Sequence, residues 1–179
     1  MRYLVSKYYR FLCLLILVQL FASISFAQNY VTKVYDEGLG LYQKVISEIL
    51  RDDDGFLWLG TESGLVRFDG SNFNEFFPKE SKYKYLGISK IKKLNNFIYI
   101  NYEKNGLLVF DLNKYQYKKI FDEPIIDVQP ISDSAFVVIT KSGFLKKIIN
   151  GKTVQQIKIA ASGESLMALF RGELYVSLP

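Results

Sequence analysis

The amino-acid sequence predicts an all-β fold, and three observations agree on this. Aromatic and β-branched residues are abundant, and Phe, Trp and Tyr alone make up 16% of the 179 residues. Short apolar runs are bounded by Gly, Asn, Asp and Ser, which is typical of strands joined by tight turns. The 3.6-residue spacing of an amphipathic helix is not found after the first 27 residues. We therefore expect strands, and almost no helix, beyond Ala27.

Residues 1–27 have the composition of an export signal. Their start carries three basic residues and no acidic one, and an apolar run follows from Phe11 to Phe21. Ser25 and Ala27 place small residues where a signal peptidase needs them, just before Gln28. The apolar run is shorter than the roughly 20 residues that span a bilayer. We expect cleavage and export, with an uncleaved membrane anchor as the alternative.

The residue types exclude several kinds of chemistry. Histidine is absent from the whole chain, and the single cysteine, Cys13, lies in the segment expected to be removed. Zinc sites built on these residues, Cys–His and Ser–His catalysis, and phosphotransfer through histidine are thereby excluded for this chain. Without disulfides the exported part must be stabilised by an ordinary core. We expect no catalytic residue, no metal site and no cofactor.

The charge balance changes when residues 1–27 are removed. Three of the 23 basic residues lie in this segment and none of the 18 acidic ones does, so the net charge falls from +5 to +2. Such a small excess gives no indication of nucleic acid or an anionic membrane surface as a partner.

A repeat of close to 40 residues runs through the rest of the sequence. Three copies and the beginning of a fourth align, at Ile46–Phe76, Ile88–Ile120, Ile125–Ile157 and Leu166–Ser177. One position is occupied in turn by Trp58, Tyr99, Val138 and Tyr175, at spacings of 41, 39 and 37 residues. A period near 40 with four short strands in each unit is typical of β-propeller blades. The predicted fold is therefore a partial β-propeller of antiparallel four-stranded blades.

Each copy is expected to contribute four strands. In the first copy these are Val45–Leu50, Phe56–Gly60, Gly64–Phe68 and Phe73–Phe76. Asp and Asn in the turns can bond the backbone two residues on, and Gly accepts positive φ. Trp58, in mid-strand, is expected to fill the wedge between blades, and Gly60 to allow close approach of the backbone. The repeat motif consists of Gly55, Trp58, Gly60, Thr61, Gly64, Leu65, Phe68, Asp69 and Gly70.

The boundaries follow from the repeat. We expect blades at 45–77, 88–120 and 125–159, and a half blade at 165–179. A leading strand over Asn29–Tyr35 is expected as well, poorly paired because the blade that it would complete is missing.

The run "DDDG" (Asp52–Gly55) invites comparison with a calcium-binding loop. Such a loop needs D-x-[DN]-x-[DN]-G, and Leu50 stands where the first Asp should be. We interpret the run as a solvated hairpin turn.

Three stretches resemble the two-component regulator propeller repeats of bacterial periplasmic sensors. They are "DEGLG" (Asp36–Gly40), "ILRDDDGFLWLGTESGLVRFDG" (Ile49–Gly70) and "NFNEF" (Asn72–Phe76). The resemblance implies a large periplasmic β-propeller array, an immunoglobulin-like three-tyrosine domain, a transmembrane helix, and a cytoplasmic histidine kinase or helix-turn-helix output. Relatives that sense glycan fragments imply an oligosaccharide or another small periplasmic ligand as the partner.

The chain departs from this plan in its size. It holds roughly three and a half blades, whereas a closed propeller needs at least about four. We expect the N-terminal piece of a longer sensor, completed by further blades and signalling domains. The alternative is a short propeller that assembles with itself, for example as a homodimer.

The expected function is the ligand-sensing part of a two-component receptor, without enzymatic activity of its own. The ligand-binding residues are not indicated, because Tyr83, Tyr85 and Tyr102, which would suit sugar faces, are interpreted as packing or surface aromatics. One alternative is a non-catalytic interaction scaffold. Another is a propeller enzyme such as a glycosidase, because "DDDGFLW" partly matches the sialidase Asp-box at Asp53, Gly55 and Trp58. Glycoside hydrolysis, however, needs two facing carboxylates or an activated tyrosine with an arginine clamp.

Overall fold

The structure, a computed structural model, describes residues 8, 10, 12–16, 32–35, 38, 40–42, 45–79, 83, 86–160 and 165–178. The chain divides into two compact units, Met1–Val34 and Tyr35–Pro179. In the first unit residues 8, 10 and 12–16 are helical. The expected cleavage site before Gln28 lies outside the described residues. Within the described ranges, no helix has both the length and the apolarity to cross a membrane.

The second unit is built from antiparallel sheets that follow one another along the chain. Blade 1 contains β1 (Ile46–Arg51), β2 (Leu57–Thr61), β3 (Leu65–Phe68) and β4 (Phe73–Phe76). Blade 2 contains β5 (Ile88–Leu94), β6 (Phe97–Tyr102), β7 (Gly106–Asp111) and β8 (Gln116–Phe121). Blade 3 contains β9 (Ile125–Ser132), β10 (Ala135–Thr140), β11 (Phe144–Ile149) and β12 (Lys152–Lys158). Blade 4 contains β13 (Leu166–Phe170) and β14 (Glu173–Ser177). The predicted all-β fold is confirmed: this is a partial β-propeller of consecutive antiparallel sheets.

The strand expected over Asn29–Tyr35 is not found where the structure describes this segment. Residues 32–35 have no regular secondary structure, and residues 29–31 lie outside the described ranges. None of the described strands pairs with residues 32–35. Tyr35 instead packs edge-on against Phe68 and Phe73, with ring centroids 4.9 and 5.6 Å apart. An aromatic contact thus takes the place of the expected backbone ladder.

The turns have the chemistry that the sequence predicts. Asp69 Oδ1 accepts hydrogen bonds from the backbone N–H groups of Ser71 (2.9 Å) and Asn72 (2.7 Å). These backbone hydrogen bonds, that from Asn72 above all, lower the pKa of Asp69. Asp111 makes the same turn in blade 2 by accepting from the N–H of Asn113 at 2.9 Å. The "FD" corner of the repeat is therefore an Asx turn that leads from the third strand to the fourth.

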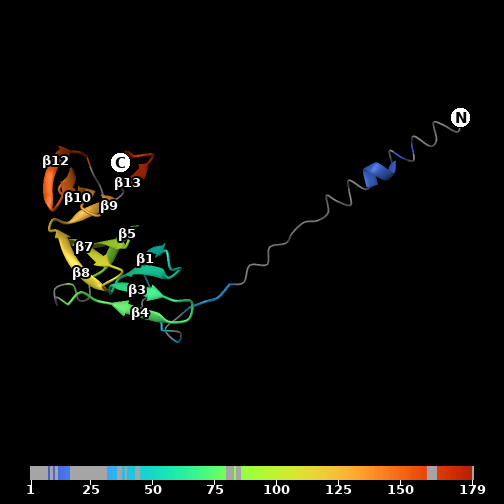
Figure 1. Cartoon of the computed structure of the whole chain (residues 1–179), viewed down its shortest axis with the longest axis horizontal. Coiled ribbons are helices and arrows are strands. Elements are labelled where there is room, and N and C mark those ends of the chain that lie inside the picture. The colour runs from blue at the N-terminus through green and yellow to red at the C-terminus, as the bar shows by residue number, and fades with distance from the viewer. Residues whose placement is uncertain are drawn as a thin grey trace. The chain divides into compact units, whose positions relative to one another are not determined.

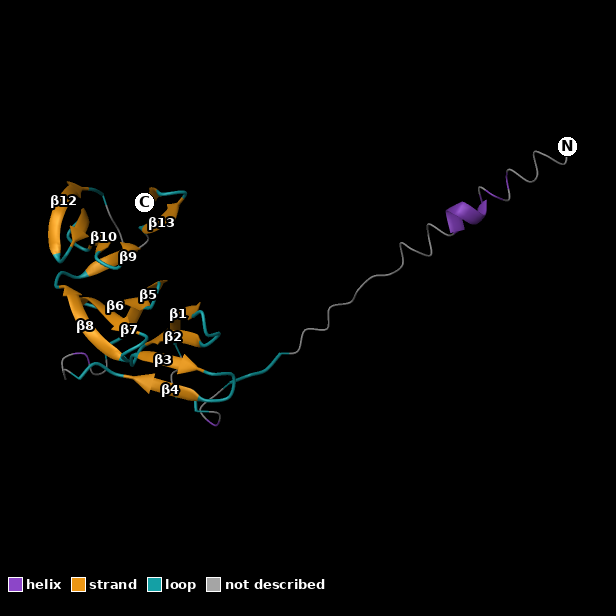
Figure 2. Cartoon of the chain, viewed as in Figure 1, coloured by secondary structure: helices purple, strands orange, loops and turns teal. Residues whose placement is uncertain are grey.

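The blades of the second unit are arranged side by side, with their first strands adjacent. β1 lies beside β5, β5 beside β9, and β9 beside β13. The fourth strands, β4, β8 and β12, lie on the outer side of this arc (Figures 1 and 2). Because each sheet is flanked by the next, both faces of a blade can be buried, as in closed propellers.

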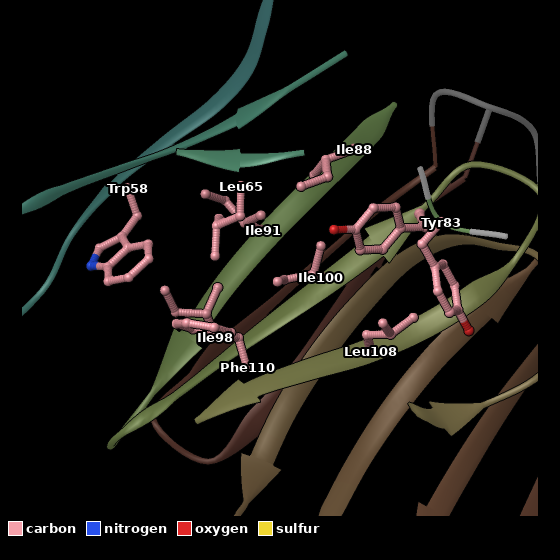
Figure 3. Close-up of a cluster of buried hydrophobic side chains, with 10 residues drawn as sticks. Trp58, Leu65, Tyr83, Ile88, Ile91, Ile98, Ile100, Leu108 and Phe110 are labelled. Carbon is pink, nitrogen blue, oxygen red and sulfur yellow. The ribbon is translucent and has the colours of Figure 1, made fainter. Parts of the chain in front are cut away.

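Apolar side chains fill the wedges between blades. Between blades 1 and 2, the buried cluster includes Trp58, Ile91, Ile98 and Phe110. Figure 3 shows Trp58 directed from blade 1 toward the last two of these residues in blade 2. Its side chain is only 1% exposed, and it lies opposite Leu50 on β1. The expected burial of Trp58 between the first two blades is confirmed.

The equivalence expected for this position does not extend to blade 3. Tyr99 and Val138 are both buried, but they share the cluster between blades 2 and 3. It is Val137 that packs in the cluster with Met167 of blade 4. Tyr175 in the two-stranded blade 4 is 53% exposed. The buried clusters shrink along the chain in the described residues, from ten members between blades 1 and 2 to seven and then three. Blade 4 is therefore held by far less apolar packing than the others.

Candidate ligand-binding site

Two carboxylates of the "DDDG" turn already have partners in the protein and do not converge on a site for a metal ion. Asp52 is buried, and its Oδ2 accepts a 2.7 Å hydrogen bond from the indole Nε1–H of Trp58. Its Oδ1 accepts from the backbone N–H of Phe56 at 2.8 Å. The neighbouring Asp53 is exposed and pairs with Lys93 of blade 2 at 2.7 Å. The turn is thus partly buried, not wholly solvated as expected, because the tryptophan needs an acceptor inside the wedge.

The glycines and the threonine of the repeat motif also have structural tasks. A Cβ on Gly60 would lie 2.9 Å from Ile88 Cγ2, so this glycine allows blade 2 to approach β2. Thr61 Oγ1 donates to the carbonyl of Gly64 at 2.8 Å and closes the β2–β3 turn. Gly55, Gly64 and Gly70 have φ values of 93°, 143° and 98°, which glycine adopts most easily.

The remaining motif residues pack rather than face solvent. Leu65 is buried, and the ring of Phe68 stacks on Phe73 with centroids 4.5 Å apart. Tyr83 and Tyr102 are buried as well, in agreement with their interpretation as packing residues, and Tyr85 lies outside the described residues. Among the described residues, no group of three or more Asp, Glu or Cys side chains is placed to hold a metal ion.

A groove between blades 2 and 3 has the properties of a small-molecule site. We call it the 2–3 groove and define it by three aromatic residues and three polar ones. The aromatic wall consists of Phe97 and Tyr99 on β6 and Phe136 on β10; the polar rim consists of Lys118 on β8, Asp133 in the β9–β10 turn and Asn150 in the β11–β12 turn. Its volume of about 500 Å³ is within the range of about 300–1,000 Å³ that is usual for ligand pockets.

Hydrogen bonds across the wedge fix the width of the 2–3 groove. Tyr99 Oη donates to the carbonyl of Ser132 at 3.2 Å. Asn95 Nδ2 donates to Asp133 Oδ1 at 2.8 Å. Burial, together with the charge of Asp133, raises the pKa of Tyr99, so the phenol stays a neutral donor. The groove is therefore preformed by contacts between the two blades.

The rim of the groove offers donors and acceptors that are open to solvent. Lys118 is exposed, and no ion pair of its side chain is found in the described part of the chain. Its neighbour Lys119 pairs with Asp122. Of the three rings, Phe97 is partly exposed, whereas Tyr99 and Phe136 are buried. A ligand with a small apolar face and several hydroxyl groups could contact Phe97 and bond to the ammonium, carboxylate and amide groups of the rim.

Sequence reasoning did not find this groove. Its wall and rim come from β6, β8, β10 and two turns of the next blade, so no motif joins them along the chain. Of its wall and rim residues, Tyr99 alone stands out in the sequence, at the repeat position that Trp58 occupies in the first copy. The adjacent lysines Lys118 and Lys119 on β8 are the one feature of the sequence that could have indicated a binding site here.

A second groove, of about 320 Å³, lies between blades 1 and 2. Phe77, Lys79 and Tyr115 are on its border, and Tyr117 spans it by donating to the carbonyl of Phe76 at 2.7 Å. Arg67 lies nearby, with its guanidinium 4.6 Å from the ring centre of Phe56. This groove is smaller and crossed by a protein hydrogen bond, so the 2–3 groove is the better candidate.

No family model matches the chain, and no curated protein matches it. Solved structures do resemble it. The extracellular domain of BT3049, assigned to a hybrid two-component system of B. thetaiotaomicron, is 17% identical with a TM-score of 0.66, over 84% of this chain and 24% of that one. The extracellular domain of BT4673 from the same organism, assigned to a one-component system, is 19% identical with a TM-score of 0.60, over 78% and 20%.

BamB from Moraxella catarrhalis is similar too, at 13% identity and a TM-score of 0.51, over 78% of this chain and 43% of BamB. The chain thus spans about a quarter of the first of these structures and less than half of each. At such identities the likeness shows the fold, and it is to extracellular domains of bacterial signalling proteins and to a propeller protein.

Proposed function

We propose that the chain is an exported, ligand-sensing propeller region of a bacterial two-component receptor. The observation that carries the proposal is the similarity of the second unit to extracellular domains from such systems, at TM-scores of 0.66 and 0.60. The resemblance of Ile49–Gly70 to regulator propeller repeats supports the same conclusion independently. In a receptor of this kind the periplasmic blades bind the ligand, and a histidine kinase or helix-turn-helix domain elsewhere in the protein gives the response.

The ligand site is the 2–3 groove, and the ligand is an oligosaccharide or a similar small polyhydroxylated molecule. The accessible part of Phe97 can take the apolar face of a sugar, while Lys118, Asp133 and Asn150 can bond to its hydroxyls. Because Phe97 and Lys118 belong to blade 2 and Asp133 and Asn150 to blade 3, a ligand bound to both pairs would favour one packing of these blades over others. A ligand that binds one arrangement of blades 2 and 3 more tightly increases the population of that arrangement. This shift would be the signal passed to the rest of the receptor.

A binding experiment tests this proposal. The protein is screened on an array of neutral and acidic oligosaccharides, and the best ligand is titrated by calorimetry against wild type and two variants. Lys118→Ala should raise Kd about tenfold, the effect of losing one charged hydrogen bond. Lys158→Ala removes an exposed lysine on β12 that does not line the groove, and should leave Kd unchanged. Equal affinity in both variants would place the ligand elsewhere, and the absence of any saturable ligand would overturn the sensing role.

A non-catalytic interaction scaffold is the second candidate. Large apolar side chains are exposed on the two ends of the blade series, at Ile49 in blade 1 and Phe170 in blade 4, and such surfaces commonly mark protein contacts. A glycosidase has less support, since Asp133 is the single carboxylate among the described residues that line the 2–3 groove, whereas hydrolysis by the common mechanism uses two.

A further inference from the structure

A buried carboxylate joins three blades near the axis of the second unit. Asp127, on β9 of blade 3, is fully buried. Its Oδ2 accepts a 2.7 Å hydrogen bond from the backbone N–H of Met167, on β13 of blade 4. Its Oδ1 accepts from the N–H of Val128 at 2.8 Å. Lys92, on β5 of blade 2, brings its ammonium within 3.2 Å of the same carboxylate.

The ammonium of Lys92 is fully used within this cluster. Besides Asp127 it donates to Gln129 Oε1 at 3.4 Å and to the carbonyl of Met167 at 3.0 Å. An ammonium has three N–H donors, and three protein acceptors surround this one. Lys90 adds a second positive charge at 3.9 Å from Asp127. Because its bonds are already satisfied, the Lys92–Asp127–Met167 cluster serves to hold blades together rather than to bind a ligand.

Apolar packing of blade 4 is limited compared with that of the other blades. The cluster between blades 3 and 4 has three buried members, of which Met167 alone comes from blade 4, and Leu174 and Val176 of β14 are only partly buried against it. Phe170 and Tyr175 of the same hairpin are 60% and 53% exposed. A two-stranded hairpin is marginally stable at best by itself. With this little apolar packing, the polar contacts of β13 contribute a large share of what holds blade 4 in place.

We propose that the Lys92–Asp127–Met167 cluster is a latch that docks β13–β14 onto blades 2 and 3. When the latch is broken, blade 4 loosens while blades 1 to 3 keep their packing. Both bonds of the latch to Met167 are to its backbone, N–H to Asp127 and C=O to Lys92, so the latch fixes the path of β13 irrespective of its side chains. Blades 2 and 3, which form the wedge of the 2–3 groove, are linked by the same latch. Through the latch, the spacing between blades 2 and 3 is coupled to the position of blade 4.

Hydrogen exchange by mass spectrometry on the full chain tests the latch. Asp127→Asn removes the charge while keeping the size of the side chain. Exchange in residues 166–177 should become at least about tenfold faster, since local opening no longer breaks the ionic bonds. Exchange in β2 and β6, in the centres of blades 1 and 2, should stay as in wild type. Asp53→Asn is the matched control, because it breaks the ion pair of Lys93 with an exposed carboxylate and should change neither region.

A second variant keeps the test decisive if Asp127→Asn does not fold. Lys92→Met retains the aliphatic stem and leaves the bond between Asp127 and the N–H of Met167 in place. This variant should accelerate hydrogen exchange in residues 166–177 as Asp127→Asn does, but by a smaller factor, and should leave β2 and β6 unchanged. The proposal is overturned if exchange in blade 4 is unchanged in the variants, or if it rises equally in all blades, which would mean a general loss of stability.

Discussion

Asp52 ties the first hairpin turn to the interior of the molecule. The bond from Trp58 Nε1 to its carboxylate gives the buried indole an acceptor, and a buried indole N–H without a partner would be costly. The sequence predicted the burial of Trp58 from its place in the repeat. It did not single out Asp52, because three consecutive aspartates are equivalent until the direction of each side chain is known.

Three alanine variants separate these roles. Trp58→Ala should lower the free energy of unfolding by about 3–5 kcal/mol, as for other large core aromatics. Asp52→Ala should cost about 1.5–3 kcal/mol, because it removes a charged hydrogen bond to a buried donor. Asp53→Ala should cost less than about 1 kcal/mol, because its ion pair is exposed. Urea denaturation followed by circular dichroism provides the three values, and equal losses for Asp52 and Asp53 would refute the assigned roles.

Tyr102 makes stability depend on pH at the alkaline end. Burial raises the pKa of Tyr102 to about 12, from 10.0 for an ordinary tyrosine. The folded chain therefore holds this proton more tightly than the unfolded chain. The resulting stabilisation is complete below pH 10 and is lost as the pH rises from 10 through 12.

A comparison of two phenylalanine variants checks this prediction. The free energy of unfolding of Tyr102→Phe should fall less steeply between pH 10 and 12 than that of wild type. Tyr175→Phe, which removes a hydroxyl on an exposed side chain, should keep the wild-type slope. Identical slopes in wild type and Tyr102→Phe would show that Tyr102 does not contribute.

At the scale of elements, strands with clear turn residues were predictable and isolated ones were not. The four strands of blade 1 agree with the predicted ones to within one residue at each end, because Gly marks every turn and Asp marks two of the three. The strand expected over Asn29–Tyr35 is wrong for residues 32–35, since a strand needs a partner and the apolar pattern of a segment cannot supply one.

Glycines in the turns differ in what they are needed for. Gly106 has a φ of 79°, and a Cβ there would lie 2.3 Å from the carbonyl oxygen of Phe121. Gly151 has a φ of 75° and no atom within 4 Å of such a Cβ. Gly106→Ala should therefore cost about 3 kcal/mol or more, from strain and overlap together. Gly151→Ala should cost about 1 kcal/mol, from backbone strain alone. Thermal unfolding of both variants tests this, and similar melting temperatures would contradict the overlap at Gly106.

At the scale of the whole molecule, the two ends of the blade series expose apolar side chains. Ile49 of blade 1 is 59% exposed and Phe170 of blade 4 is 60% exposed. Interior blades bury such faces against a neighbour, so the ends should associate with other copies as the concentration rises. Sedimentation velocity should show a growing oligomer fraction in wild type and a smaller one in Phe170→Lys. A strictly monomeric protein at all concentrations would be inconsistent with these faces being open.

The candidate site belongs to this scale too, which is why the sequence did not indicate it. Asn150 of the 2–3 groove comes near Phe97 and Lys118 only when blade 3 packs on blade 2. A repeat reveals which residues are equivalent from blade to blade. Residues that differ between the copies, such as those of the groove, cannot be recognised from it. Asp127 of the latch illustrates the same point, because it and Lys90, outside the latch, occupy equivalent places in β9 and β5 with opposite charges.

The central claim is that the repeat packs as blades through the position of Trp58, and the single tryptophan allows a direct measurement. Acrylamide quenching of its fluorescence in the purified protein reports the access of solvent to the wedge between blades 1 and 2. A buried Trp58 should show a blue-shifted emission and weak quenching in buffer, and both properties should be lost in one step with urea. Quenching in buffer as strong as in urea would show that Trp58 is exposed, and would contradict the packing of blade 1 on blade 2.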